Sequence, residues 1–191
     1  EQAHVRMTPD GGVEIAMGVQ NHGQGMETTM AQVAAEVLGI DAARVRLIHG
    51  DTGLTPYATG TYASRAMIMN GGAAAEGCEA LLEKLRPLAA HLLQCRAEEI
   101  RFGEGRAHGP SGASAAFEDL ARLWYLRPHE LPRDLNVGGL EVSVGYRPED
   151  DRGAFSFATH VAVVEVDAGL GDVRLRDYVV AHDCGTRVHP V

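Results

Sequence analysis

Asn21-His22-Gly23-Gln24-Gly25-Met26-Glu27-Thr28-Thr29 joins a strand-like run of residues to a strongly helical one. The glycines on either side of Gln24 allow a ligand to approach the main chain closely. The helix that follows leaves its first backbone N–H donors unpaired and adds the positive end of its dipole. This junction therefore suits an anion or a polar heterocycle.

A second stretch, Thr59-Gly60-Thr61-Tyr62-Ala63-Ser64-Arg65, repeats this pattern. Small hydroxyl residues and a glycine again precede a long helical segment. Ser64 is placed to cap that helix, a use that is compatible with contacting a ligand. Two such loops in one chain suggest one extended ligand.

The spacing of apolar and turn residues predicts the order of the helices and strands. Alternating runs at 4–8 and 13–17 flank Pro9-Asp10-Gly11-Gly12, which predicts a hairpin. Apolar residues at helical spacing then predict a helix over 24–38 that stops at Gly39. The remaining segments are a strand at 45–48, a long helix at 64–93, a small hairpin within 99–107, a helix from a Ser114 cap to Trp124, and strands at 140–146, 156–167 and 172–182. This order predicts an α+β fold with helices packed on a mainly antiparallel sheet.

Small residues gather near the start of the long helical segment. Gly71-Gly72-Ala73-Ala74-Ala75 leaves one face of this helix thin, so we expect another backbone to pack closely there. Leucines at helical spacing follow and form a conventional apolar stripe. The organisation we expect is a half with both loops at 1–95, a small insert and linker at 96–139, and a strand-rich segment at 140–191.

The composition excludes several classes of protein. The 191 residues, 45% of them hydrophobic, suffice for a globular core. The net charge of -9 argues against a nucleic-acid partner, and we expect no membrane partner because the apolar runs are only strand-length. Cys78, Cys95 and Cys184 are widely spaced, which argues against a disulfide framework or a structural zinc site. No pair of histidines has the spacing of metal ligands, so we expect no metal bound directly by the protein.

The ends of the chain suggest a fragment of a longer protein, and its basic residues suggest a bacterial source. Glu1 is not a natural initiator, and Val191 directly follows a turn at 185–190, so we expect a piece of something longer. Lys84 is the only lysine, the other basic residues being arginines, which is typical of a GC-rich bacterial genome.

Both loops resemble those of a known family. The motifs are Gly23-Gln24-Gly25-Met26-Glu27-Thr28-Thr29-Met30-Ala31-Gln32, then Gly50-Asp51-Thr52, then Pro56 with Gly60-Thr61-Tyr62-Ala63-Ser64-Arg65. The segments His160–Asp167, Gly171-Asp172-Val173 and Val179–Pro190 add to the likeness. In this order they resemble the molybdenum-cofactor-binding part of the xanthine dehydrogenase and aldehyde oxidase family, in the branch of aerobic carbon monoxide dehydrogenase large subunits. The match runs over 13–191 and is weaker between 96 and 153.

The resemblance implies a site and a chemistry. The family's cofactor is molybdopterin, for which the cytosine dinucleotide form is one option. Its reaction is oxidative hydroxylation of an aldehyde, a heterocycle or a purine, or oxidation of carbon monoxide, with oxygen derived from water. The residues implied as cofactor contacts are His22, Gly23, Gln24, Gly25, Thr61, Tyr62, Ala63, Ser64 and Arg65, with the backbone of Ala63 close to the molybdenum. The family's catalytic glutamate lies downstream of Val191, so no catalytic residue is expected in this chain. The resemblance also implies the remainder of a large subunit, partner subunits with iron–sulfur clusters and FAD, and a bacterial cytoplasmic enzyme.

Several residues have a second interpretation. Gln24 could belong to an ordinary helix-start turn, Arg65 could pair with an acidic neighbour, and the role of Tyr62 is open. For Glu27 the helix dipole alone is a sufficient explanation. Ala66 stands where the family often has serine, which leaves open a non-catalytic scaffold or interaction domain that kept the fold without the cofactor. A nucleotide-phosphate binder ranks last, because the chain lacks a Walker lysine and a GxGxxG fingerprint.

Overall fold

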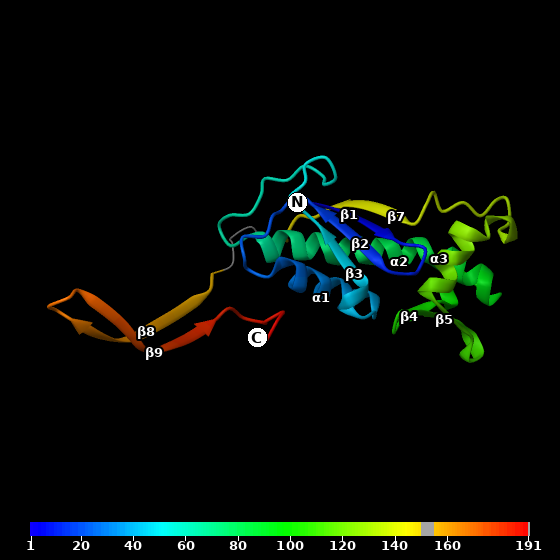
Figure 1. Cartoon of the computed structure of the whole chain (residues 1–191). Coiled ribbons are helices and arrows are strands. Elements are labelled where there is room, and N and C mark those ends of the chain that lie inside the picture. The colour runs from blue at the N-terminus through cyan, green and yellow to red at the C-terminus, as the bar shows by residue number, and fades with distance from the viewer. Residues whose placement is uncertain (150–154, 191) are drawn as a thin grey trace. The chain divides into compact units, whose positions relative to one another are not determined.

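The computed structural model describes residues 1–149 and 155–190. The chain divides into two compact units, Glu1–Glu149 and Asp150–Val191. Figure 1 shows the helices and the larger sheet in the first unit and a long hairpin in the second.

The first unit is built on a four-stranded sheet in the order β3-β2-β1-β7. Its strands are β1 (Gln2–Met7), β2 (Val13–Met17), β3 (Val45–Ile48) and β7 (Glu141–Gly145). The central strand β1 is antiparallel to β2 and to β7, whereas β2 and β3 are parallel. Alternate β1 residues are buried, as expected for a strand with one face on a core. The predicted hairpin and the mainly antiparallel sheet are confirmed.

Two helices cover this sheet (Figure 1), and their buried side chains form the core together with those of the strands. The longer helix, α2 (Gly72–Leu93), packs against β1 and β7, and α1 (Met26–Leu38) packs beside it against β3. Gly39, in the left-handed conformation, ends α1 as predicted. The fully buried side chains include Met30 and Leu38 from α1, Leu81, Leu85 and Leu88 from α2, and Met7, Ile15 and Met17 from the sheet.

The small residues of α2 allow a close approach, but not by another backbone. A Cβ added at Gly72 would lie 2.4 Å from the ring of Tyr146, and one added at Gly77 would lie 2.5 Å from Cγ2 of Val5. The expectation of close packing here is confirmed. The expected partner is wrong, because the space is occupied by a side chain of β1 and by the side chain that directly follows β7.

A small three-stranded sheet and a third helix complete the first unit. The strands are β4 (Arg101–Gly103), β5 (Arg106–His108) and β6 (Ser114–Ala116), and the helix is α3 (Phe117–Leu126). Short helical turns lie at Ala42–Arg44, Ala97–Glu99, Pro110–Gly112 and Pro128–Glu130, and a π-helix at Ala66–Gly71 leads into α2. The hairpin predicted within 99–107 is confirmed. The predicted cap at Ser114 is wrong: this residue pairs with His108 in the sheet, and Asp119 accepts the N–H of Ala116 at the helix start (2.9 Å).

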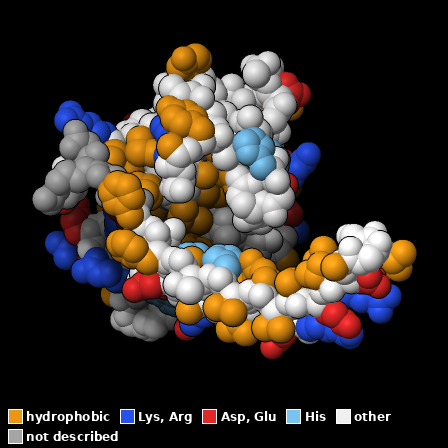
Figure 2. All heavy atoms as spheres, turned by 90° about the vertical axis from the view of Figure 1, so that its left-hand side faces the viewer, with side chains coloured by type: hydrophobic (Ala, Val, Ile, Leu, Met, Phe, Trp, Pro, Cys, Tyr) orange, Lys and Arg blue, Asp and Glu red, His pale blue; other side chains and the backbone are white. Residues whose placement is uncertain are grey.

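The second unit is the antiparallel hairpin of β8 (Phe157–Asp167) and β9 (Asp172–Asp183). The side chain of Asp167 accepts the backbone N–H groups of Gly169 and Leu170 in the turn. Valines and other large apolar residues are exposed along both strands, and hydrophobic side chains of this hairpin gather at its surface in Figure 2. Both strands were predicted. The strand predicted at 140–146 is instead β7 of the first unit, because its backbone pairs with β1. The predicted three-part organisation of the chain is not tested by these contacts and stays a prediction.

Candidate functional site

The glycine loop before α1 has an open main chain. Gly25 takes the left-handed conformation (φ 75°, ψ 33°) at the N-cap, and the first bond of the helix joins Thr29 N to Gly25 O at 3.1 Å. Gly23 also has a positive φ of 102°. A Cβ added at Gly23 or Gly25 would meet no heavy atom within 4 Å among residues 1–149 and 155–190. The glycines therefore leave the start of α1 accessible to a ligand.

Side chains of the loop fold back onto its own backbone. Oε1 of Gln24 accepts the N–H of His22 at 2.5 Å, and Oδ1 of Asn21 accepts the N–H of Gly23 at 2.9 Å. His22, Gly23 and Gln24 are all exposed. The amide of Gln24, the residue with the strongest predicted role, lies at the surface beside the two glycines.

The second loop carries strained backbone. Ala63 and Ser64 follow one another with φ values of 49° and 54°, in the left-handed region that L-residues disfavour. Each costs of the order of 1–3 kcal/mol, and such strain is typical of functional sites. The predicted cap at Ser64 is wrong, because the helical run begins with the π-helix, for which Arg65 is in the capping position. Tyr62, Ala63 and Ser64 are exposed.

The structure brings the two loops together. Oγ1 of Thr61 donates to the carbonyl of Gln20 at 2.7 Å and accepts the N–H of Gln20 at 3.1 Å. Close by, a Cβ added at Gly18 would lie 2.5 Å from Cβ of Ala58. Residues 18–20, which precede the first loop, are thereby held against residues 58–61 at the start of the second.

Arg65 pairs with an acidic neighbour, one of its two sequence interpretations. It forms an ion pair with Glu1, donates to the carbonyl of Gly60 at 3.0 Å and lies over the ring of Tyr62, 5.1 Å from its centroid. Burial raises the pKa of the Glu1 carboxyl, but hydrogen bonds from Arg65 and Thr59 outweigh it and the net pKa is lowered. Arg65 therefore holds its own loop in shape, and direct contact with a cofactor stays a prediction.

Glu27 makes contacts that the sequence did not indicate. Its carboxylate accepts a hydrogen bond from Nδ2 of Asn21, and its Oε1 lies 2.9 Å from Nε2 of His49. A hydrogen bond at its own backbone and the bond with His49 lower the pKa of this carboxyl. The dipole of α1 explains an acidic residue at this place but not these partners. No sequence signal joins residues 27 and 49, because only the fold brings the end of β3 to the start of α1.

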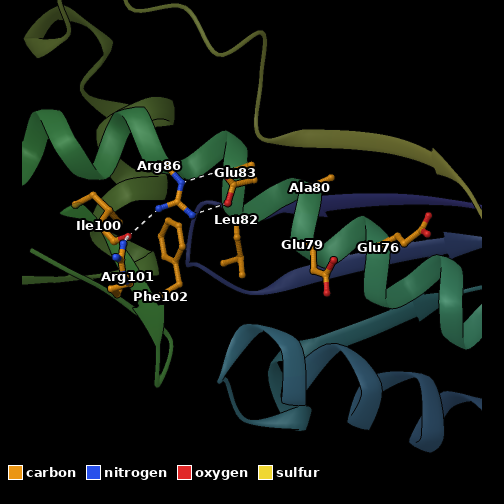
Figure 3. Close-up of a pocket in the computed structure, with 9 residues that line it drawn as sticks. All are labelled: Glu76, Glu79, Ala80, Leu82, Glu83, Arg86, Ile100, Arg101 and Phe102. Carbon is orange, nitrogen blue, oxygen red and sulfur yellow. Dashed lines mark hydrogen bonds and ion pairs between the residues drawn. The ribbon is translucent and has the colours of Figure 1, made fainter. Parts of the chain in front are cut away.

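A groove between α2 and β4 lies away from both loops. Its volume is about 650 Å³, and Figure 3 shows Glu76, Glu79 and Glu83 along one side of α2 with Arg86 reaching toward β4. Arg86 donates to Glu83 and to the carbonyl of Ile100 and lies over the ring of Phe102. Its lining, within the described part of the chain, includes none of the nine residues predicted to contact the cofactor. The groove is therefore not the predicted site.

Other reactive side chains do not form a centre of their own. Burial, with a smaller effect of Glu79, raises the pKa of the Cys78 thiol to about 12, so Cys78 stays a neutral thiol in the core. Over 1–149 and 155–190, no three His, Cys, Asp or Glu side chains lie together as metal ligands would. In the same ranges no helix has the length and apolar character needed to cross a membrane.

Comparisons with known proteins identify the family and the fold. A family model for the molybdopterin cofactor-binding domain matches residues 1–191. The chain is 31% identical over 191 residues to the carbon monoxide dehydrogenase large chain of Hydrogenophaga pseudoflava, covering 100% of this chain and 23% of that one. It is 32% identical over 192 residues to the nicotine 6-hydroxylase large subunit of Paenarthrobacter nicotinovorans, again covering 100% of this chain and 23% of the relative.

A solved structure has the same fold. The crystal structure of quinoline 2-oxidoreductase from Pseudomonas putida 86 superposes with a TM-score of 0.77 at 32% identity, covering 99% of this chain and 24% of that one. The chain thus spans about a quarter of the length of the relatives it matches. The family resemblance and the fold class predicted from the sequence are confirmed, and the chain belongs to the family of molybdopterin cofactor-binding domains.

Proposed function

We propose that this chain forms part of the cofactor site of a molybdenum hydroxylase large subunit, with molybdopterin held by the two loops. The observation that carries the proposal is the pair of hydrogen bonds between Thr61 and Gln20. They join the open glycine loop before α1 to the loop at 59–65, in a chain that matches the family along its whole length. The proposed contact residues are those of 22–25 and 61–65. The general base of the reaction belongs to another part of the subunit.

The residues present fit such a group. The start of α1 offers backbone N–H donors and the positive end of a 13-residue helix, which suits an anionic or heterocyclic ligand. The empty space beside Gly23 and Gly25 in the described structure allows that ligand to reach the main chain. The amide of Gln24 supplies both a donor and an acceptor for a pterin edge. When bound, the cofactor supplies the redox chemistry of hydroxylation, in its simple or its cytosine dinucleotide form.

The proposal extends to the rest of the enzyme. The exposed apolar side chains of β8 and β9 supply a surface for the remainder of the large subunit, since an isolated two-stranded hairpin is only marginally stable in water. Iron–sulfur and FAD-containing subunits would accept the electrons, and a small molecule would be the substrate. Similarity to the 6-hydroxypseudooxynicotine dehydrogenase complex subunit gamma of Paenarthrobacter nicotinovorans supports an assembly of several subunits. We place the enzyme in the bacterial cytoplasm.

A Gln24→Ala substitution in the full-length subunit tests the proposal. Losing one hydrogen-bonding side chain at the ligand should weaken cofactor retention by about tenfold. Molybdenum and pterin per subunit should fall, while the melting temperature stays near the wild-type value because Gln24 is exposed. Gln2→Ala, at another exposed glutamine, is the matched control. Equal cofactor content in the two variants would show that the loop does not bind the cofactor.

A second candidate function rests on one residue. Ala66 stands where the resemblance to the family implies a serine, so one hydroxyl that could contact the cofactor is missing. A scaffold that kept the fold without the cofactor would tolerate this change. Folded wild-type protein without molybdenum or pterin would favour that alternative.

A further inference from the structure

A chain of hydrogen bonds links the sheet to the glycine loop. His49 directly follows β3, and its Nε2 lies 2.9 Å from Oε1 of Glu27 in the first turn of α1. Glu27 in turn accepts a hydrogen bond from Nδ2 of Asn21. The other end of the Asn21 amide, Oδ1, accepts the N–H of Gly23 at 2.9 Å. The loop is thus tied to the sheet through three side chains.

The chemistry of these side chains fixes the direction of each bond. Both carboxylate oxygens of Glu27 accept, so Asn21 and His49 must each present an N–H group. This sets the orientation of the Asn21 amide, whose oxygen then faces Gly23. It also places the hydrogen of His49 on Nε2. The other ring nitrogen, Nδ1, is buried and has no hydrogen-bond partner among the described residues, so a hydrogen placed there would be an unpaired buried donor.

The 21–25 loop, which this chain of hydrogen bonds restrains, would otherwise be flexible because of its glycines. Gly23 and Gly25 both have positive φ, and glycine loses more conformational freedom than any other residue when it is ordered. A loop that is already ordered binds its ligand more tightly than one that must be ordered on binding. A restraint that reaches back to a strand of the sheet provides this order.

We propose that Glu27 and His49 are positioning residues, which hold the 21–25 loop in the conformation that receives the cofactor. The predicted effect on cofactor retention rests on the proposed function. The predicted effect on the rigidity of the loop does not, because it can be measured without the cofactor. Neither residue is assigned a contact with the reacting atoms.

Glu27→Gln in the full-length subunit is the sharpest test, because it preserves shape and changes one acceptor into a donor. The new NH₂ group must face either the NH₂ of Asn21 or the N–H of His49. Two donors would then face each other. This mismatch is removed only if the Asn21 amide turns over and loses its hydrogen bond with the N–H of Gly23, or if His49 moves its hydrogen to the buried Nδ1. We expect hydrogen exchange in peptides covering 21–25 to become about fivefold faster or more, since each mismatch weakens the restraint. Cofactor content should fall in parallel.

Three further variants separate positioning from a general structural role. Glu36→Gln removes an exposed carboxylate from the same helix and should leave both readouts unchanged. His49→Leu has no donor and should reproduce the effect of Glu27→Gln. His49→Gln retains a donor, so its exchange rate and cofactor content should lie close to the wild-type values. Wild-type exchange at 21–25 in Glu27→Gln, or wild-type cofactor content despite faster exchange, would overturn the inference. A wild-type protein without any cofactor would instead overturn the proposed function, and exchange would still decide the role of Glu27 in the loop.

Discussion

Gly25→Val should remove most of the cofactor from the full-length subunit while leaving the first unit folded. A valine here requires a positive φ, at a cost of about 1–3 kcal/mol. Its Cβ would meet no heavy atom within 4 Å in the described ranges, so the Cβ itself displaces no atom of this part of the chain. The side chain would instead occupy the space through which a ligand reaches the start of α1. We expect molybdenum per subunit to fall by more than about tenfold, which elemental analysis measures.

Gly138→Val is the control for Gly25→Val. Gly138 also has a positive φ, of 68°, and a Cβ there would likewise meet no heavy atom within 4 Å of the described chain. It lies outside both loops, so this variant incurs the backbone strain without blocking the proposed site. Similar molybdenum contents in the two variants would contradict the assignment of the first loop.

Gly39→Val should have the largest effect on stability. Gly39 ends α1 with a φ of 66°, nearly the value at Gly138, but its added Cβ would lie 2.5 Å from the backbone N of Glu104. Backbone of the turn between β4 and β5 cannot move aside as the end of a flexible side chain can. The strain and the collision together should cost about 3 kcal/mol or more, which corresponds to roughly 10 °C in melting temperature.

Thermal unfolding of Gly39→Val and Gly138→Val side by side measures this cost. The strain at positive φ is common to both, so the difference between them reports the collision with Glu104. Melting temperatures within a degree or two of each other would show that α1 and the β4–β5 turn do not pack as described.

Local sequence patterns were sufficient for most of the elements. Val45–Ile48 and Val13–Met17 were predicted with the bounds that the structure has, because apolar alternation and neighbouring glycines are short-range signals. Strand pairing is a long-range property. The contact between His4 and Ser143 joins residues 139 apart, and nothing local to β7 indicates that it belongs beside β1. Ser114 has the chemistry of a helix cap, yet pairing with β5 decides its place.

The candidate site also combines features that local sequence patterns predict with features that only the fold reveals. The glycines and Gln24 were predicted because a loop at a helix start has a local signature. Their joining to the second loop through Thr61 became visible only in the fold. Glu27 was assigned to the helix dipole alone, because the partner that gives it a further role, His49, arrives from β3.

The most direct test of the central claim is the molybdenum and pterin content of the full-length wild-type protein, purified from a host that makes the cofactor. Elemental analysis gives the metal, and fluorescence after release gives the pterin. The proposed function predicts near-stoichiometric amounts of both in folded protein. Folded, full-length protein that contains neither would contradict it and would favour a scaffold that kept the fold alone.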